Sequence, residues 1–219
     1  KYSEMTGFSF HPVKSIAAGE GGMITTNNYS IYKKLIRYRS HGINKLDDSF
    51  INKQNSETNG LINPWYYEMQ ELGYNYRITD IQCALGLSQL KKLDKFLERR
   101  KDLVNRYDEV FKAFKNLNPI QIEDRDLSSH HLYVVRINFE KIKTSRAELM
   151  NKLKKRGILC QVHYIPVTSQ PYYLELGYNT TEYPESLNFY KEALSIPLYY
   201  TLSNEDQRSV IKILKELVG

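Results

Sequence analysis

The sequence has few cysteines and no long apolar run. Its 219 residues include two cysteines, Cys83 and Cys160, which stand far apart in apolar segments. Neither a paired metal-binding motif nor a disulfide framework is expected, and both thiols are predicted to be buried and reduced. No stretch of about 18 apolar residues exists to cross a membrane, and residues 1–10 lack the apolar centre of a signal peptide. We expect a cytoplasmic protein with no bound metal and no membrane segment.

Charge of one sign is not concentrated anywhere in the sequence. The formal net charge is +6, from 31 Lys and Arg against 25 Asp and Glu. In two strongly basic stretches, residues 91–103 and 148–157, acidic residues stand among the basic ones. Proteins that bind nucleic acid instead gather positive charge on one face, so nucleic acid is not expected as a partner. With 41% hydrophobic residues, this length is enough for one large or two small domains with an apolar core.

Patterns in the first half of the chain predict both strands and helices. Residues 22–26 (GMITT) are typical of a short strand after a double glycine, and residues 30–40 carry apolar or aromatic side chains at helical spacing. Residues 43–66 are polar, rich in Asn and interrupted by Gly and Pro, which predicts a long loop. Thr79 and Gln82 have the spacing of a capping box, so one or two long helices are expected to follow Thr79.

The second half of the chain predicts a smaller α/β unit. The expected elements are a strand at 131–139, a helix at 145–157 closed by Gly157, a strand at 158–165, a helix from 185 stopped by Pro197, and a final helix with Asn204 as its cap. The fold class is therefore α/β. A change of domain is expected in the long helix near Lys92, which gives domains of residues 1–92 and 93–219.

A lysine between apolar residues and a glycine-rich turn carries the clearest chemical signal. Lys14 is flanked by four apolar residues, Phe8, Phe10, Val13 and Ile16. A lysine is a useful covalent catalyst only when its amine is neutral part of the time, which apolar surroundings favour. Ser9 precedes Lys14 by five residues and GEGG (residues 19–22) follows it, so a hydroxyl can bind a phosphate and small residues permit close approach to a planar cofactor. A surface lysine on an apolar strand is the alternative.

Three segments in order resemble one enzyme family. SFHPVKSIAAGEGGMITT (residues 9–26) resembles the cofactor-lysine segment of the DegT/DnrJ/EryC1/StrS aminotransferases, a fold-type I family that uses pyridoxal phosphate (PLP). LGYNYRITDIQCALG (residues 72–86) is similar to the family's G-x-N-x-R segment and the helix after it, and residues 156–173 resemble its small-domain strand. The resemblance implies the carboxy-terminal part of that fold. Residues 1–92 would be the remainder of the large PLP-binding domain, with the dimer-contact segment, and 93–219 the small domain.

The resemblance also assigns cofactor-binding residues. It makes Lys14 the Schiff-base lysine and the group that moves protons, Ser9 a phosphate contact and His11 a neighbour of the cofactor. Asn75, in the G-x-N-x-R segment, would reach the phosphate of the neighbouring subunit in a homodimer. From the residues alone, the alternative for Asn75 is a loop residue at a helix start, and a histidine in an apolar strand is as often a core residue.

A nucleotide sugar is the substrate that the resemblance implies. Tyr76, Arg77 and His163 would contact the sugar, although an arginine in this position can also serve a salt bridge. The sequence of these segments is most similar to that of family members that aminate C4 of a UDP-linked 4-keto-6-deoxy-N-acetylhexosamine in pseudaminic acid synthesis. Glutamate is the amino donor that the resemblance implies. Relatives that act as dehydratases have histidine in place of the lysine, so Lys14 favours transamination.

The sequence departs from the family pattern before Lys14. Thirteen residues precede this lysine, where the family has a long stretch with its phosphate loop, the aromatic that stacks on the cofactor and the aspartate that pairs with the pyridine nitrogen. Glu4 is too near Lys14 in sequence to be assumed a substitute for that aspartate. Without such a carboxylate the cofactor is a poor electron sink. The alternative function is therefore a non-catalytic fragment that needs the amino-terminal half to bind cofactor.

Overall fold

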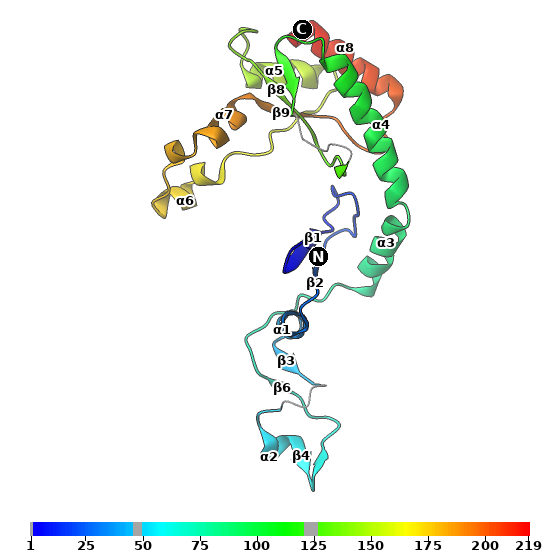
Figure 1. Ribbon diagram of the computed structural model, residues 1–219, viewed down its shortest axis with the longest axis vertical. Helices are drawn as coiled ribbons and strands as arrows, with labels where there is room; N and C mark the ends of the chain where they lie inside the picture. Colours follow the sequence, from blue (N-terminus) through cyan, green and yellow to red (C-terminus); the bar gives the residue numbers. More distant parts are fainter. Residues whose placement is uncertain (1, 46–49, 121–126) are drawn as a thin grey trace. The chain divides into compact units, whose positions relative to one another are not determined.

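The chain divides into two compact units. The computed structural model describes residues 2–45, 50–120 and 127–219. Unit 1 comprises Lys1–Lys91 and unit 2 Lys92–Gly219, and each is described by itself (Figure 1). Within the described ranges, no helix has both the length and the apolar character that crossing a bilayer requires.

Unit 1 consists of a hairpin, two helices of eleven residues and several short elements. In chain order these are β1 (Met5–Ser9), β2 (Gly22–Thr26), α1 (Tyr29–Arg39), β3 (Ile43–Asn44), α2 (Lys53–Ser56), β4 (Glu57–Thr58), β5 (Leu61–Ile62), β6 (Glu68–Met69) and α3 (Asp80–Leu90). β1 and β2 pair antiparallel, with Ser9 opposite Gly22. The expected strand and first helix are thus confirmed. Asn28 caps α1 by accepting from the amides of Ser30 and Ile31.

The predicted capping box begins α3. The Thr79 hydroxyl accepts from the Gln82 amide at 3.3 Å, and the Gln82 side chain accepts from the Thr79 amide at 3.1 Å. Two of the amides left unpaired at the start of a helix are thereby satisfied. A second helix, α4 (Leu93–Phe111), follows almost at once, so two helices rather than one follow Thr79.

The segment predicted as one long loop contains short regular elements. Residues 46–49 lie outside the described part of the chain, but 50–66 include α2 and the small β4–β5 hairpin. The Asn52 side chain accepts from the Asn55 amide, which starts α2. Asn side chains favour such local bonds to the backbone, and a composition rich in Asn conceals them because the same residues are typical of irregular loops.

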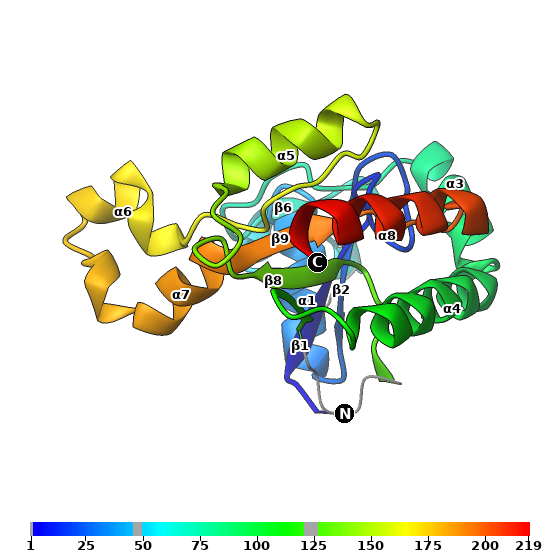
Figure 2. The ribbon, with the colours of Figure 1, turned by 90° about the horizontal axis from the view of Figure 1, so that it is seen from above.

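Unit 2 packs helices on a three-stranded antiparallel sheet with the order β7-β8-β9. Its elements are α4 (Leu93–Phe111), β7 (Leu117–Pro119), β8 (Tyr133–Ile137), α5 (Arg146–Lys155), η2 (Val167–Ser169), α6 (Pro171–Glu175), η3 (Thr180–Glu182), α7 (Pro184–Glu192), β9 (Ala193–Ile196) and α8 (Asn204–Val218). α4 and α8 lie side by side (Figures 1 and 2). The core draws on both helices, on α5 and on the sheet; its fully enclosed members include Leu103, Tyr107, Val135, Ile137, Leu149, Leu153, Leu194 and Leu214.

Two expected elements of unit 2 are confirmed as predicted, two helices are present with a different end or cap, and one expected strand is absent. The strand is β8, and the helix is α5, which has a Ser145–Glu148 capping box and ends before Gly157 at φ 80°. Residues 158–165 are not a strand, because the place beside β8 is taken by β9, to which this segment adds one bridge between Gln161 and Ser195.

The expected helix from 185 is also shorter than predicted. α7 ends at Glu192, and the next four residues, all buried, form β9. The final helix is capped by Ser203, whose hydroxyl accepts from the Asp206 amide at 2.9 Å, rather than by Asn204.

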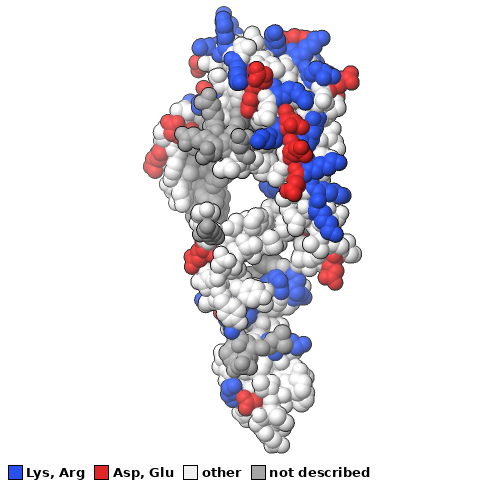
Figure 3. All heavy atoms as spheres, turned by 45° about the vertical axis from the view of Figure 1, so that its right-hand side comes forward, with Lys and Arg blue, Asp and Glu red and all other residues white. Residues whose placement is uncertain are grey.

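The expected burial of both cysteines is wrong for one of them. Cys83 lies exposed on α3, and Cys160 is half-buried; neither forms a disulfide. On the face drawn in Figure 3, Lys and Arg side chains over unit 2 are interleaved with Asp and Glu, as in the α4 sequence LDKFLERRKDL.

Candidate functional site

Lys14 lies in the connection between β1 and β2. Its amide donates to the His11 carbonyl at 2.9 Å, which closes a tight turn. The residue is half-buried. Among the described residues, no hydrogen bond or ion pair engages the Lys14 ammonium group.

Two backbone bonds and two glycines shape this loop. Phe10 donates to Gly21 and Ala18 donates to Phe10, each at 2.9 Å. A Cβ on Gly21, at φ 140°, would lie 2.9 Å from Cδ1 of Ile78, and a Cβ on Gly22 would lie 2.7 Å from the Phe8 carbonyl oxygen. Packing within the chain thus requires glycine at these positions. This is a second reason for the glycines, beside the close approach of a cofactor that the sequence suggested.

Helix α3 supports the Lys14 loop from one side. Ala18 is 1% exposed, and a Cβ placed on Gly86 of α3 would be in ordinary contact with it at 3.7 Å. The Gln82 side-chain amide donates to the Glu20 carbonyl at 3.0 Å. A segment that lies 62 residues further along the chain therefore fixes the loop that carries Lys14.

Ser9 and His11 lie in the same loop region as Lys14. The Ser9 hydroxyl accepts weakly from the His11 amide at 3.4 Å, and the imidazole accepts from the Val13 amide at the same distance. The other ring nitrogen is 3.8 Å from the Glu20 carboxylate, with both side chains well exposed at 49% and 72%. Exposed pairs of this kind contribute little to stability, so His11 is not locked in place.

The apolar surroundings expected around Lys14 are incomplete in this chain. Phe8 is 47% exposed and Val13 is 61% exposed, while Phe10 and Ile16 are half-buried. The described residues alone do not place the amine in an apolar pocket.

Asn75, Tyr76 and Arg77 all have exposed side chains, on a segment whose backbone is well anchored. The amides of Tyr74 and Tyr76 donate to the carbonyls of Tyr38 and Arg39 at 3.1 and 2.9 Å. Asn75 itself pairs with Ser40 in an isolated bridge. The segment is thus held firmly while its side chains stay exposed, and the Asn75 side-chain oxygen accepts from the Arg77 amide at 3.5 Å.

Two glycines allow that anchoring. A Cβ on Gly42 would lie 1.6 Å from the Glu71 carbonyl oxygen, and a Cβ on Gly73 would lie 2.3 Å from the Gly42 nitrogen. The backbone segments at Gly42 and Gly73 cross so closely that neither position has room for a side chain. This support for Asn75 was not predicted from the sequence. His41 and Gly42, which lie at the crossing, both have a positive φ, of 62° and 69°.

His163 belongs to unit 2, whereas the other predicted site residues belong to unit 1. Its Nδ1 lies 2.7 Å from the hydroxyl of buried Ser195, and its ring contacts Tyr164 edge-on at 4.6 Å. Two backbone bonds between Gln161 and Ser195, at 2.8 and 3.1 Å, hold the same segment. The histidine is half-buried and oriented by β9.

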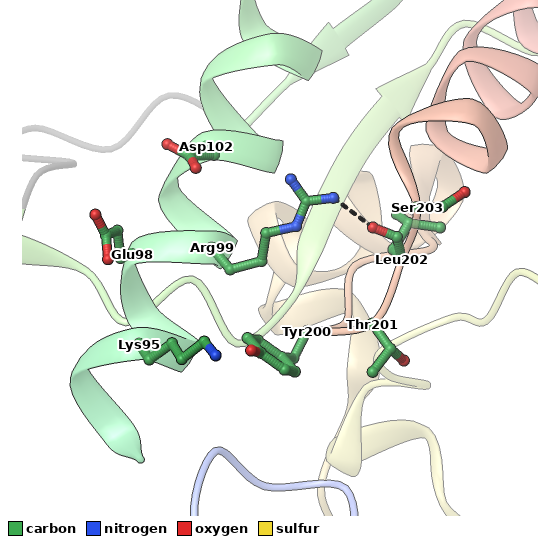
Figure 4. Close-up of a pocket in the computed structure, with 8 residues that line it drawn as sticks. All are labelled: Lys95, Glu98, Arg99, Asp102, Tyr200, Thr201, Leu202 and Ser203. Carbon is green, nitrogen blue, oxygen red and sulfur yellow. Dashed lines mark hydrogen bonds between the residues drawn. The ribbon is translucent and has the colours of Figure 1, made fainter.

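A surface hollow of about 380 Å³ in unit 2 contains none of these residues (Figure 4). It lies between α4 and the segment before α8. Arg99 crosses it and donates to the Leu202 carbonyl at 2.5 Å and to Asn204 at 2.9 Å. The guanidinium therefore joins the two helices. Among the described residues, no group of three His, Cys, Asp or Glu side chains is arranged to hold a metal.

The sequence matches the DegT/DnrJ/EryC1/StrS aminotransferase family over residues 1–215. The chain belongs to this family. It is 36% identical over 217 residues to the spore coat polysaccharide biosynthesis protein SpsC of Bacillus subtilis, a match that covers 98% of this chain and 54% of SpsC. It is 37% identical over 210 residues to the UDP-4-amino-4,6-dideoxy-N-acetyl-beta-L-altrosamine transaminase of Campylobacter jejuni, covering 96% of this chain and 51% of that enzyme.

Solved aminotransferase structures share the fold. Helicobacter pylori PseC, an aminotransferase of pseudaminic acid biosynthesis, aligns with a TM-score of 0.85 at 30% identity over 99% of this chain and 54% of its own. The sugar aminotransferase Spr1654 of Streptococcus pneumoniae, in its PMP form, gives 0.82 at 31% identity, covering 99% of this chain and 51% of its own. The chain thus has the fold of the carboxy-terminal part of a fold-type I transferase, as the sequence predicted. It spans about half the length of the relatives it matches.

Proposed function

We propose that the chain is part of a PLP-dependent nucleotide-sugar aminotransferase in which Lys14 carries the cofactor. The observation that carries this proposal is the Lys14 loop: an amine without a partner among the described residues, in a turn held by the hairpin and by α3, in a member of an aminotransferase family. Ser9, five residues away, offers a hydroxyl for the phosphate, and His11 would lie near the cofactor. The amine of Lys14, the hydroxyl of Ser9 and the imidazole of His11 are chemical groups that suit the aldehyde and phosphate of pyridoxal phosphate.

Lys14 would act as base and acid during transamination. Bound PLP supplies an electron sink for the carbon that gains or loses the amino group. The amine of Lys14 would take a proton from one carbon and return it to another, which requires that no other group of the chain hold it. The exposed His11–Glu20 pair leaves the loop side chains free to adjust when a ligand binds.

We propose that two copies share each site. Asn75 would reach the cofactor phosphate of a neighbouring subunit, and its exposed side chain on an anchored backbone supports that role. Tyr76 and Arg77, exposed on the same segment, would contact the sugar. His163, oriented by Ser195, would contribute a ring nitrogen from the small domain.

The proposed reaction moves an amino group from glutamate to the C4 keto group of a UDP-linked 4-keto-6-deoxy-N-acetylhexosamine. The similarity to the Campylobacter jejuni transaminase and to PseC supports this substrate. Residues 1–92 would complete the large PLP-binding domain and 93–219 would form the small domain, a boundary supported by the division of the chain between Lys91 and Lys92. The cytoplasmic location stays a prediction.

A non-catalytic fragment is the second candidate, because unit 1 exposes much apolar surface. Ile81 of α3 is 83% exposed, Leu72 77% and Trp65 73%. Such surface marks places where other protein belongs. On this reading the chain folds but needs further polypeptide to bind cofactor.

Mapping of the cofactor lysine tests the proposal. The chain is incubated with one equivalent of PLP, reduced with borohydride and digested, and the labelled peptide is identified by mass spectrometry. We expect the label on Lys14, its loss in Lys14→Ala and its retention in Lys34→Ala, a matched change at an exposed lysine of α1. A folded chain with no label, or with label scattered over surface lysines, would support the non-catalytic candidate.

A further inference from the structure

Gln82 makes two sets of hydrogen bonds in opposite directions. Its side-chain oxygen accepts from the backbone amide and the hydroxyl of Thr79, at 3.1 and 3.0 Å, and completes the capping box of α3. Its side-chain nitrogen donates to the carbonyl of Glu20 at 3.0 Å. Glu20 belongs to the GEGG turn that closes the Lys14 loop. One amide thus links the start of a helix to the loop that carries the proposed cofactor lysine.

Apolar contacts flank this bond on both sides. The side chain of Ile78, just before α3, fills the space where Gly21 lacks a Cβ. Nearly two turns into α3, Gly86 faces buried Ala18. These contacts press the loop against α3 without fixing its orientation, because packing of small apolar groups is not directional. The hydrogen bond from Gln82 to the Glu20 carbonyl is directional and so can fix how the loop is oriented on α3.

We propose that Gln82 is a positioning residue for Lys14: it holds the GEGG end of the loop on α3 and so sets where the Lys14 amine stands. The proposal rests on the proposed function for the role of Lys14 as cofactor lysine, whereas the contact between Gln82 and the loop is observed. Capping a helix requires an acceptor at this position, and glutamate serves as well as glutamine. The Glu20 carbonyl requires a donor, which an ionised glutamate lacks. The amide therefore has a purpose beyond capping.

Two substitutions separate the two purposes. Gln82→Glu keeps the acceptor for Thr79 and adds a negative charge at the helix start, where the dipole favours it, so α3 remains capped. It loses the donor to Glu20. Thr79→Ala does the reverse, since it removes the capping hydroxyl and leaves the Gln82 nitrogen available to Glu20. Gln89→Glu adds the same charge to the last turn of the same helix, away from Glu20, and so shows what added charge alone does to the loop.

Amide hydrogen exchange on the cofactor-free chain is the first measurement. The amides of Phe10, Lys14 and Ala18 are hydrogen-bonded within the loop and report its order. We expect Gln82→Glu to speed their exchange about fivefold, the effect of one lost neutral hydrogen bond, and to leave α3 amides unchanged. Thr79→Ala should speed exchange at the start of α3 instead, and Gln89→Glu should change neither the loop amides nor those at the start of α3. Loop exchange that is unchanged in Gln82→Glu, or raised equally in Thr79→Ala or Gln89→Glu, overturns the proposal.

The second measurement is PLP labelling of Lys14 as a function of pH, with the unfolding midpoint as a control for folding. We expect Gln82→Glu to reduce labelling several-fold at each pH without lowering that midpoint. If the wild-type chain takes no label but its loop loosens in Gln82→Glu, the positioning role stands and the proposed function fails. If the wild-type chain labels on Lys14 and Gln82→Glu labels equally well, the positioning role fails and the function stands.

Discussion

At the scale of single residues, the Glu68 carboxylate accepts four hydrogen bonds. It accepts from the Ile51 amide at 2.5 Å, the Asn52 amide at 3.1 Å, the Gln70 side chain at 2.6 Å and the Tyr66 hydroxyl at 2.7 Å. Loss of water around the carboxylate raises its pKa, but these hydrogen bonds together lower it from 4.5 to about 2. The ionised form of Glu68 therefore organises the segment from residue 51 to residue 70.

This assignment predicts how acid affects the segment. A pKa lowered by folding stabilises the folded state above the unfolded value of 4.5, and that stabilisation is lost as the pH falls towards about 2. Fluorescence of Trp65, the one tryptophan of the chain, should report the loss in this range. Glu68→Gln should remove most of the pH dependence and loosen the segment at pH 7. An identical acid transition in Glu68→Gln would assign it to other carboxylates.

The two cysteines should differ in reactivity. Burial raises the pKa of the Cys160 thiol to about 12, so almost no thiolate is present at neutral pH. Cys83 is exposed on α3. With iodoacetamide at pH 8, we expect Cys83 to be modified more than about tenfold faster, as followed by peptide mass mapping. Equal rates in the folded chain, with both rising together in denaturant, would contradict this order.

At the scale of elements, the crossing of residues 38–42 with residues 71–76 holds the proposed cofactor-binding Asn75. Gly42→Ala places a methyl group where the Glu71 carbonyl stands, and it should disrupt unit 1 severely. Gly60→Ala is the control, because Gly60 has a similar φ of 76° but open space around it, so the cost should be about 1 kcal/mol. Urea unfolding followed by Trp65 fluorescence compares the two. Equal effects would show that the crossing is looser than described.

Elements were predictable where local signals agree with packing. The box at Thr79 places the start of α3 because the capping side chain acts within one turn, and Gly157 marks the end of α5. β9 was missed because ALSI continues the helical pattern of α7, and only the vacancy beside β8, created by distant residues, selects a strand. Residues 158–165 show the converse, since their strand-like pattern finds a single bridge.

In the candidate site too, residues that are near in sequence were predictable, and residues brought together by packing were not. Lys14, Ser9 and His11 lie within one stretch of six residues that precedes the strand predicted at 22–26, so their closeness was predictable, but the β1–β2 hairpin that carries them was not. The contributions of Gln82 and Gly86 were not, because a bond between residues 20 and 82 depends on how α3 packs. Ser195, which orients His163, was hidden for the same reason, 32 residues away in a segment predicted as helix.

At the scale of the whole molecule, the apolar core is unevenly distributed. Of the described apolar side chains that are buried, Ala18 and Phe50 belong to unit 1, and the others belong to unit 2. Unit 1 owes its described order chiefly to hydrogen bonds and glycine contacts. Unit 2 has the ingredients of an independently stable domain.

Paired leucine substitutions test how much the core of unit 2 contributes to stability. Leu149 is fully buried in the core, and Leu159 is 71% exposed. Leu149→Ala should lower the free energy of unfolding by about 2–5 kcal/mol, whereas Leu159→Ala should change it by less than about 0.5 kcal/mol. Urea unfolding followed by far-ultraviolet circular dichroism gives both values. A small effect at Leu149 would mean that the core can collapse around the missing atoms.

The direct passage from α7 to β9 restricts how this family member can change in length. Glu192 ends the helix and Ala193 begins the strand, so no spare residue separates them. Because side chains alternate between the faces of a strand, one inserted residue here would turn Ser195 to the face that Leu194 and Ile196 now occupy. The hydroxyl that meets His163 would then enter the apolar core. Evolution can lengthen this chain at its loops, but at this junction a single added codon would exchange the face that meets His163 with the face that enters the core.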